Sequence, residues 1–221
     1  MSAREVRIIR EQETIALLQS DVVGELLEHA LAAAGWELGS WELVSVHHRP
    51  GAGATGVYSL EVRRAGRVFG SPRHAVTEPA PMHACITSCA IPHPTPRVAV
   101  FHRRGTDALS VWVHPADPLL PGLAFALDPA RMTPFGLGPG REPDETELDL
   151  RSYRPLRRAV VLARNGEDHG YLKVLRHQGA KPLADRHRML RAAGVPVPVP
   201  VSRRRTSWPC TQHQAWRWPN C

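Results

Sequence analysis

The chain has 221 residues, of which 43% are hydrophobic, so it is long enough for two small domains and can bury an ordinary core. Its formal net charge is +7, but residues 202–221 contribute four arginines and no acid, so the basic excess of the remaining chain is small and nucleic acid is an unlikely partner for it. The chain has no long uncharged apolar stretch, no apolar signal-peptide core near its charged N-terminus, and only four cysteines, which are expected to be thiols; this predicts a cytoplasmic protein with no membrane partner.

The first 140 residues predict a mixed module of one helix followed by antiparallel strands. Apolar residues at helical spacing predict a helix over Gln12–Ala34 that ends at Gly35. Residues 77–97 are rich in proline and histidine and are expected to form a loop. The other expected elements are strands at Trp41–His48 and Val57–Arg64 around the glycine-rich turn Pro50–Gly56, a strand from Arg67 toward Val76, a hairpin of Arg97–His102 with Ala108–Val113, and a short helix over 122–133.

The segment Gly136–Thr146 is rich in glycine, proline and acids, and we place a domain boundary in it. The expected elements beyond it are strands at Glu147–Ser152, Arg158–Ala163 and Tyr171–Leu175, and a helix at Leu183–Ala193. The predicted fold class is therefore α+β, with a mixed module over 1–140, a small lobe of curved antiparallel sheet plus one helix over 141–201, and a tail over 202–221.

A weak internal repeat links the two halves. Residues 41–67 and 146–174 share the succession of a strand, an aromatic residue or histidine, an Arg-Pro turn and a second strand. The first copy has no lysine in its third strand, so we expect it to act as scaffold, and short hairpins also resemble one another by chance.

The residue that points most clearly to chemistry is Lys173. Of 28 basic residues only Lys173 and Lys181 are lysine, and Lys173 lies in the predicted strand Y-L-K-V. A compact ammonium suits a polyphosphate, while the backbone of a strand–turn–strand segment covers the phosphates. We therefore predict a nucleotide site made of Lys173 and the turn residues Tyr153, Arg154, Arg157 and Arg158. The alternative is an ordinary solvated lysine on a strand.

The stretch S-Y-R-P-L-R-R-A-V-V, a polar turn, Y-L-K-V, and a helix ending in L-R-A-A-G-V-P-V-P resembles the N-terminal lobe of the aminoglycoside phosphotransferase-like kinase family. It looks most like the uncharacterised phosphotransferases of GC-rich actinobacteria, and V-W-V-H-P-A-D-P-L-L-P-G-L-A-F-A-L-D-P resembles their N-terminal module. The resemblance implies a protein-kinase-like fold and ATP-dependent phosphorylation of a small hydroxyl compound, with ATP and Mg²⁺ as cofactors of the full-length family.

The chain departs from this family pattern in three places. Leu156 stands in the turn where glycine is expected, and the only acid available to pair with Lys173 is the short side chain of Asp185. No H-G-D-x-x-x-x-N loop and no later metal-binding aspartate follow, and His114-Pro-Ala-Asp117 lies upstream of the lysine. We expect weak nucleotide binding, no phosphoryl transfer and no catalytic residue in this chain.

The tail S-R-R-R-T-S-W-P-C-T-Q-H-Q-A-W-R-W-P-N-C allows three interpretations. It could bind RNA through arginine and tryptophan, which makes a non-catalytic nucleic-acid-binding protein the alternative function. It could be a disordered end. Its composition favours a third hypothesis, a frameshift near Val201 that leaves a truncated phosphotransferase with its catalytic lobe absent.

A further candidate is the pattern H-x-C-x3-C-x3-H. His83, Cys85, Cys89 and His93 have a spacing that zinc permits, but they lie in one proline-rich segment without a second ligand pair. Ordinary thiols and imidazoles of a loop are the plainer interpretation, and we predict no metal ligands.

Overall fold

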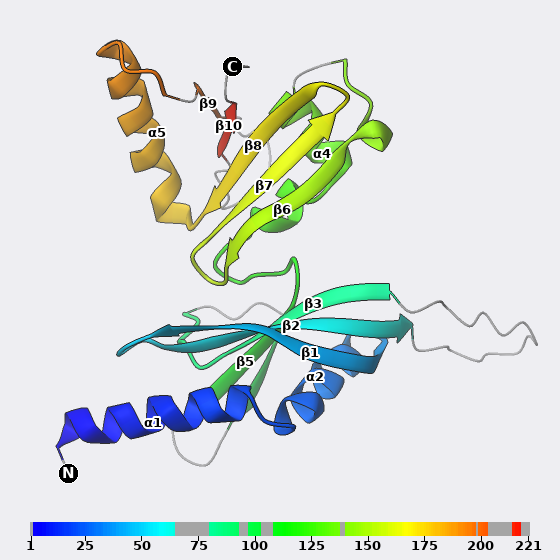
Figure 1. The fold of residues 1–221 in the computed structure, drawn as a ribbon, viewed down its shortest axis with the longest axis vertical. Helices are drawn as coiled ribbons and strands as arrows, with labels where there is room; N and C mark the ends of the chain where they lie inside the picture. Colours follow the sequence, from blue (N-terminus) through cyan, green and yellow to red (C-terminus); the bar gives the residue numbers. More distant parts are fainter. Residues whose placement is uncertain are drawn as a thin grey trace, which may run out of the picture. The chain divides into compact units, whose positions relative to one another are not determined.

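The computed structural model describes residues 2–64, 80–92, 97–102, 108–137, 140–197, 199–202 and 214–217, in two compact units, Met1–His114 and Pro115–Cys221 (Figure 1). Both units combine helices with an antiparallel sheet, so the predicted α+β class is confirmed. The division between the units lies earlier than Gly136–Thr146, because Leu120, Leu123 and Met132 are buried against the second sheet. In the part of the chain that is described, no helix is both long and apolar enough to cross a membrane.

The first unit begins with two helices, α1 (Ala3–Leu18) and α2 (Val22–Ala33), where the sequence predicted one. Ser2 and Glu5 form a capping box at the start of α1. The helix stops at Leu18, whose carbonyl accepts a hydrogen bond from Tyr58 Oη at 2.8 Å. A tertiary contact inside the core therefore satisfies a carbonyl at the helix end, and helical periodicity cannot reveal such a contact.

The first sheet has five antiparallel strands in the order β1-β2-β3-β5-β4. The loop expected over 77–97 is wrong for residues 80–87, which form β3. Residues 84–87 are all buried, so this strand lacks the alternation of polar and apolar residues by which a strand is recognised in a sequence. The expected hairpin of 97–102 with 108–113 is confirmed, and the strand expected from Arg67 toward Val76 lies outside the described residues. The strands are β1 (Trp36–Arg49), β2 (Gly53–Arg64), β3 (Ala80–Thr87), β4 (Val98–His102) and β5 (Ala108–Val113).

Helices α1 and α2 cover one face of this sheet (Figure 1). Their buried side chains pack against a fully buried row of β2 and β3. Burial of this many aliphatic side chains is the main stabilising term of the unit. The core includes Leu18, Val23, Leu27 and Leu31 from the helices, and Tyr58, Leu60, Val62, Ala84 and Ile86 from the strands.

The second unit repeats this plan. Short helices precede a sheet with the order β6-β7-β8-β10-β9, which is the strand order of the first sheet, and they cover one of its faces. The strands expected at Glu147–Ser152, Arg158–Ala163 and Tyr171–Leu175 are confirmed, with longer bounds. The elements are α3 (Leu123–Ala126), α4 (Pro129–Met132), the π-helical turn η1 (Thr133–Leu137), the 3-10 turn η2 (Pro143–Glu145), β6 (Glu147–Arg154), β7 (Arg158–Asn165), β8 (Asp168–Leu175), α5 (His177–Ala192), β9 (Val199–Ser202) and β10 (Gln214–Arg217).

Candidate functional site

The turn between β6 and β7 is a tight Arg-Pro turn. Arg157 N–H donates to the Arg154 carbonyl at 3.0 Å, and Leu156 has a φ of 61°. Proline at the second position and a positive φ at the third are the features of a type II turn, which normally has glycine where Leu156 stands. The Leu156 side chain is 3% exposed, so burial offsets the unfavourable backbone conformation.

A buried carboxylate holds this turn. Asp117 is 2% exposed, and its Oδ2 accepts hydrogen bonds from Leu156 N–H at 2.7 Å and Tyr153 Oη at 2.9 Å. Its Oδ1 accepts from the N–H groups of Leu119 and Leu120, which fixes the carboxylate itself. Burial raises the pKa of the Asp117 carboxyl, and these four hydrogen bonds offset part of that rise.

The remaining polar groups of the turn also have partners inside the unit. Arg176 Nε donates to the Leu156 carbonyl, so that both backbone groups of Leu156 are occupied. The bond from Leu156 to Asp117 and the bond from Arg157 to Arg154 therefore use the backbone N–H groups of both turn residues. A phosphate would therefore not find free amides at these two positions, unlike the expected phosphate-covering loop.

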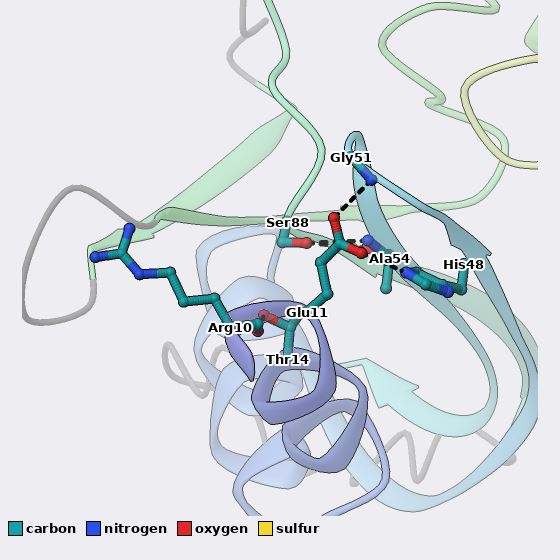
Figure 2. Close-up of polar contacts among 7 residues, drawn as sticks. All are labelled: Arg10, Glu11, Thr14, His48, Gly51, Ala54 and Ser88. Atoms are coloured by element: carbon teal, nitrogen blue, oxygen red, sulfur yellow. Dashed lines mark hydrogen bonds and ion pairs between the residues drawn. The ribbon is translucent and has the colours of Figure 1, made fainter. Parts of the chain in front are cut away.

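The β1–β2 turn of the first unit has the same construction, as Figure 2 shows. Glu11 of α1 accepts from Gly51 N–H at 2.6 Å through Oε1 and bonds His48 Nε2 at 3.0 Å through Oε2. Ala52 N–H donates to the Arg49 carbonyl at 2.9 Å, and Gly51 has a φ of 77°. His48 thus corresponds to Tyr153, Gly51 to Leu156 and Glu11 to Asp117, which supports the predicted repeat.

Strand register places three cations on one face of the second sheet. Arg154 lies directly opposite Arg158, and Lys173 lies opposite Val160, two residues further along β7. Residues two apart on a strand share a face, so Arg154, Arg158 and Lys173 lie together on what we call the cationic face. The other face is the core face, which carries Ala159, Val161, Leu172 and Val174.

Among the described residues, none of these three cations has an acidic partner. Asp149, the nearest acid on this face of β6, pairs with Arg151 at 3.1 Å. Asp185, the expected partner of Lys173, instead pairs with Lys181 at 2.9 Å and with Arg188, its neighbours on the exposed surface of α5. Those pairs hold the Asp185 pKa below its usual value, with the Lys181 hydrogen bond as the main cause.

Of the five predicted nucleotide-binding residues, the structure brings four to one end of the sheet. Arg157 is exposed in the turn beside Arg154 and Arg158. Tyr153 differs, because it packs on the core face and donates its hydroxyl to Asp117. Asp117 is the residue that fixes the turn, but its only sequence signal is its place upstream of the lysine in His114-Pro-Ala-Asp117, and no local pattern marks its role.

The corresponding position of the first unit holds no cation. In the second sheet Lys173 lies opposite Val160, and the equivalent pair in the first sheet is Thr87 opposite Thr55. Thr87 is fully buried, and its hydroxyl is hydrogen-bonded to the Thr55 hydroxyl at 2.6 Å. A Cβ on Gly53 would come within 2.8 Å of Ser88 Oγ and 3.1 Å of Cys89 N, so the chain's own segment fills the space beside the glycine-rich turn. These contacts support the expectation that the first unit is scaffold.

The cysteine and histidine pattern does not assemble a metal site in the part of the chain that is described, which holds no group of three or more potential ligands. Cys85 is fully buried on β3, and Cys89 Sγ lies 3.9 Å from Thr55 Oγ1. His83 packs edge-to-face on His114, with 6.4 Å between ring centroids. His93 lies outside the described residues.

Most of the arginine- and tryptophan-rich tail lies outside the described residues, so its proposed contacts with RNA remain a prediction. Its backbone is described at β10, where Trp216 pairs with Tyr171 of β8, and β10 also pairs with β9 on its other side.

In comparisons with known proteins, no family model, curated protein or solved structure matches this chain.

Proposed function

We propose that the second unit binds the phosphates of a nucleoside triphosphate on its cationic face, as the small lobe of a kinase does, without transferring a phosphoryl group. The observation that carries this proposal is the placement of Arg154, Arg158 and Lys173 on one face of the sheet with no acidic partner among the described residues.

Electrostatics supports an anionic ligand at this face. Like charges directly opposite each other on neighbouring strands destabilise a sheet, and Arg154 and Arg158 form such a pair. An anion lying over the pair would offset that repulsion, because hydrogen bonds between guanidinium and phosphate are stronger than those between neutral groups. The pair is therefore better suited to binding than to stability.

The order of the elements supports a kinase-like mode of binding. In protein kinases the lysine that contacts the phosphates lies on the third strand, after the hairpin that covers them, and the next helix lies close to it. Lys173 lies on the third strand of its sheet, after the β6–β7 hairpin, and α5 follows it directly. A Cβ on Gly179 of α5 would lie 3.6 Å from Leu175 Cβ, so the helix begins close to Leu175, which shares the cationic face with Lys173.

Transfer of a phosphoryl group requires a base and metal ligands in addition to the residues that bind the phosphates. The sequence contains no H-G-D-x-x-x-x-N motif, and Asp149 on the cationic face is engaged by Arg151. Mg²⁺ would therefore arrive with the nucleotide and be held by its phosphates, and we expect ATP to bind without turnover.

Titration calorimetry of the full chain with Mg-ATP tests the proposal. Lys173→Met should weaken binding by about tenfold or more, since a charge-assisted contact is lost. The matched control is Lys181→Met, because Lys181 is the other lysine of the chain and is paired with Asp185. Equal affinities for the wild type and Lys173→Met, or no binding by the wild type, would refute the proposal.

A further inference from the structure

We infer that the cationic face recognises the polyphosphate chain of its ligand through side-chain charge, so that inorganic triphosphate binds there without a nucleoside. This inference rests on the proposed function for the location of the site. It goes further by naming the part of the ligand that supplies the affinity.

The first argument is that the turn has little backbone left to offer. Leu156 N–H donates to Asp117, and Arg157 N–H donates to Arg154. A glycine-rich phosphate loop works through free N–H groups, which recognise the shape of a phosphate as well as its charge. Since these two are occupied, the guanidinium groups and the ammonium group must supply the attraction, and their attraction depends chiefly on the number of negative charges.

The second argument is the size of the charged region. Directly opposite residues lie about 5 Å apart, and successive rows on one face lie about 7 Å apart along the strand. Arg154 and Arg158 form one row, and Lys173 lies in the next. In the following rows each acid has an arginine beside it, because Asp149 pairs with Arg151 and Glu147 lies opposite Arg164, so the region of net positive charge covers about two rows. It suits a short polyanion, whereas a nucleic-acid strand running along the sheet would find no net positive charge in those further rows.

The third argument is the small apolar surface beside the cations. Leu162, in the row after Lys173, is 2% exposed, and Val160 and Leu175 in the two charged rows are only partly exposed. Tyr171, opposite Leu162, is also only partly exposed and packs edge-to-face on His169, with 6.4 Å between ring centroids. A nucleoside would add little contact there compared with three charge-assisted phosphate contacts.

The experiment is to titrate the full chain, in low salt and without Mg²⁺, with sodium triphosphate, ATP, AMP and a short oligothymidylate. Triphosphate and ATP should bind within about tenfold of each other, and AMP should bind much more weakly because it carries less charge. Binding should weaken as salt is added, because Arg154 and Arg158 are exposed to solvent and Lys173 is partly exposed.

Two arginine variants locate the site. Arg158→Gln should weaken triphosphate binding by about tenfold or more. Arg164→Gln should leave it unchanged, although Arg164 is exposed on the same strand and the same face, because it lies at the far end opposite Glu147 and His169. Both side chains are exposed, so neither variant should unfold at a much lower temperature than the wild type, and Arg158→Gln should be slightly more stable because it removes the repulsion from Arg154.

Each result separates this inference from the proposed function. Binding of ATP without binding of triphosphate overturns the inference and leaves the nucleotide site standing. Triphosphate binding that is sensitive to Arg158→Gln, with no ATP binding, supports the inference and refutes the nucleotide site. Oligothymidylate that binds as tightly as triphosphate overturns the inference in favour of a nucleic-acid surface, and no binding of any ligand overturns both.

Discussion

Leu156 and Gly51 hold the same place in two different turns. Each follows an Arg-Pro pair, each has a positive φ, of 61° and 77°, and each donates its backbone N–H to a carboxylate, that of Asp117 or of Glu11. Positive φ is easy for glycine and unfavourable for leucine. The shared conformation of such different residues indicates that the carboxylate contact fixes the turn.

The strain at Leu156 should be measurable by two substitutions. Leu156→Ala and Leu156→Gly both remove the buried side chain, but only glycine relieves the positive φ. We expect Leu156→Gly to be more stable than Leu156→Ala by about 1 kcal/mol, measured by chemical denaturation. A more stable alanine variant, as is usual within a strand, would contradict the observed backbone conformation.

Replacing the two carboxylates should affect each turn separately. Asp117→Asn leaves one oxygen to accept from four donors and should cost about 3 kcal/mol, because the site is buried. Glu11→Gln should cost about 1 kcal/mol, since its carboxylate bonds the Gly51 N–H and His48 at a partly exposed site. Hydrogen exchange gives the decisive measurement: Asp117→Asn should speed exchange of the Leu156 amide and leave that of Gly51 unchanged.

The close packing beside the glycine-rich turn predicts a large effect at Gly53. Gly53 and Gly35 both have a positive φ, of 103° and 78°, but only at Gly53 would a Cβ meet other atoms. Gly35→Ala should therefore cost about 1 kcal/mol and Gly53→Ala about 2 to 3 kcal/mol. Equal losses in thermal stability would show that the 88–89 segment does not pack there as described.

The first unit should lose stability in mild acid because of His114. Burial, and then the charge of His83, lower the pKa of His114 from 6.5 to about 4. Between these two values the unfolded chain binds the proton and the folded chain does not, so stability falls as the pH falls from 6.5 to 4, by at most about 3 kcal/mol. His114→Gln should flatten this part of the pH profile, and an unchanged slope would exclude His114 as its source.

The pairing of Asp185 predicts that this residue is dispensable. Asp185 is exposed and bound to Lys181 and Arg188 on its own helix, and such surface pairs contribute little. Asp185→Ala should change neither the unfolding temperature nor ATP affinity beyond experimental error. A large loss of ATP affinity would instead mean that Asp185 moves to Lys173 when nucleotide binds.

The sequence predicted the hairpins well because their signals are local. Alternating residues and the Arg-Pro and Asn-Gly turns identify β1–β2, β6–β7 and β7–β8, and register then follows from the turn. The common face of Arg154, Arg158 and Lys173 is a direct result of that register, so most of the candidate site could be read from the sequence.

The features that the sequence could not predict depend on contacts between distant residues. Strand β3 is buried on both faces and lies among prolines, so it shows no alternation. The Leu18 carbonyl at the end of α1 is bonded by Tyr58, forty positions away, and the β6–β7 turn is held by Asp117, thirty-nine positions from Leu156. Periodicity and turn chemistry act over a few residues and carry no information about such pairs.

A turn whose backbone is bonded by a distant carboxylate tolerates different residues at the bonded position. Asp117 and Glu11 each accept a hydrogen bond from a backbone N–H, which every residue except proline provides, so the same turn occurs with leucine and with glycine at its third position. Replacing the residue at that position should therefore cost less stability than removing the acid. An upstream acid together with the Arg-Pro pair is accordingly a better sequence signature for this hairpin than a glycine motif.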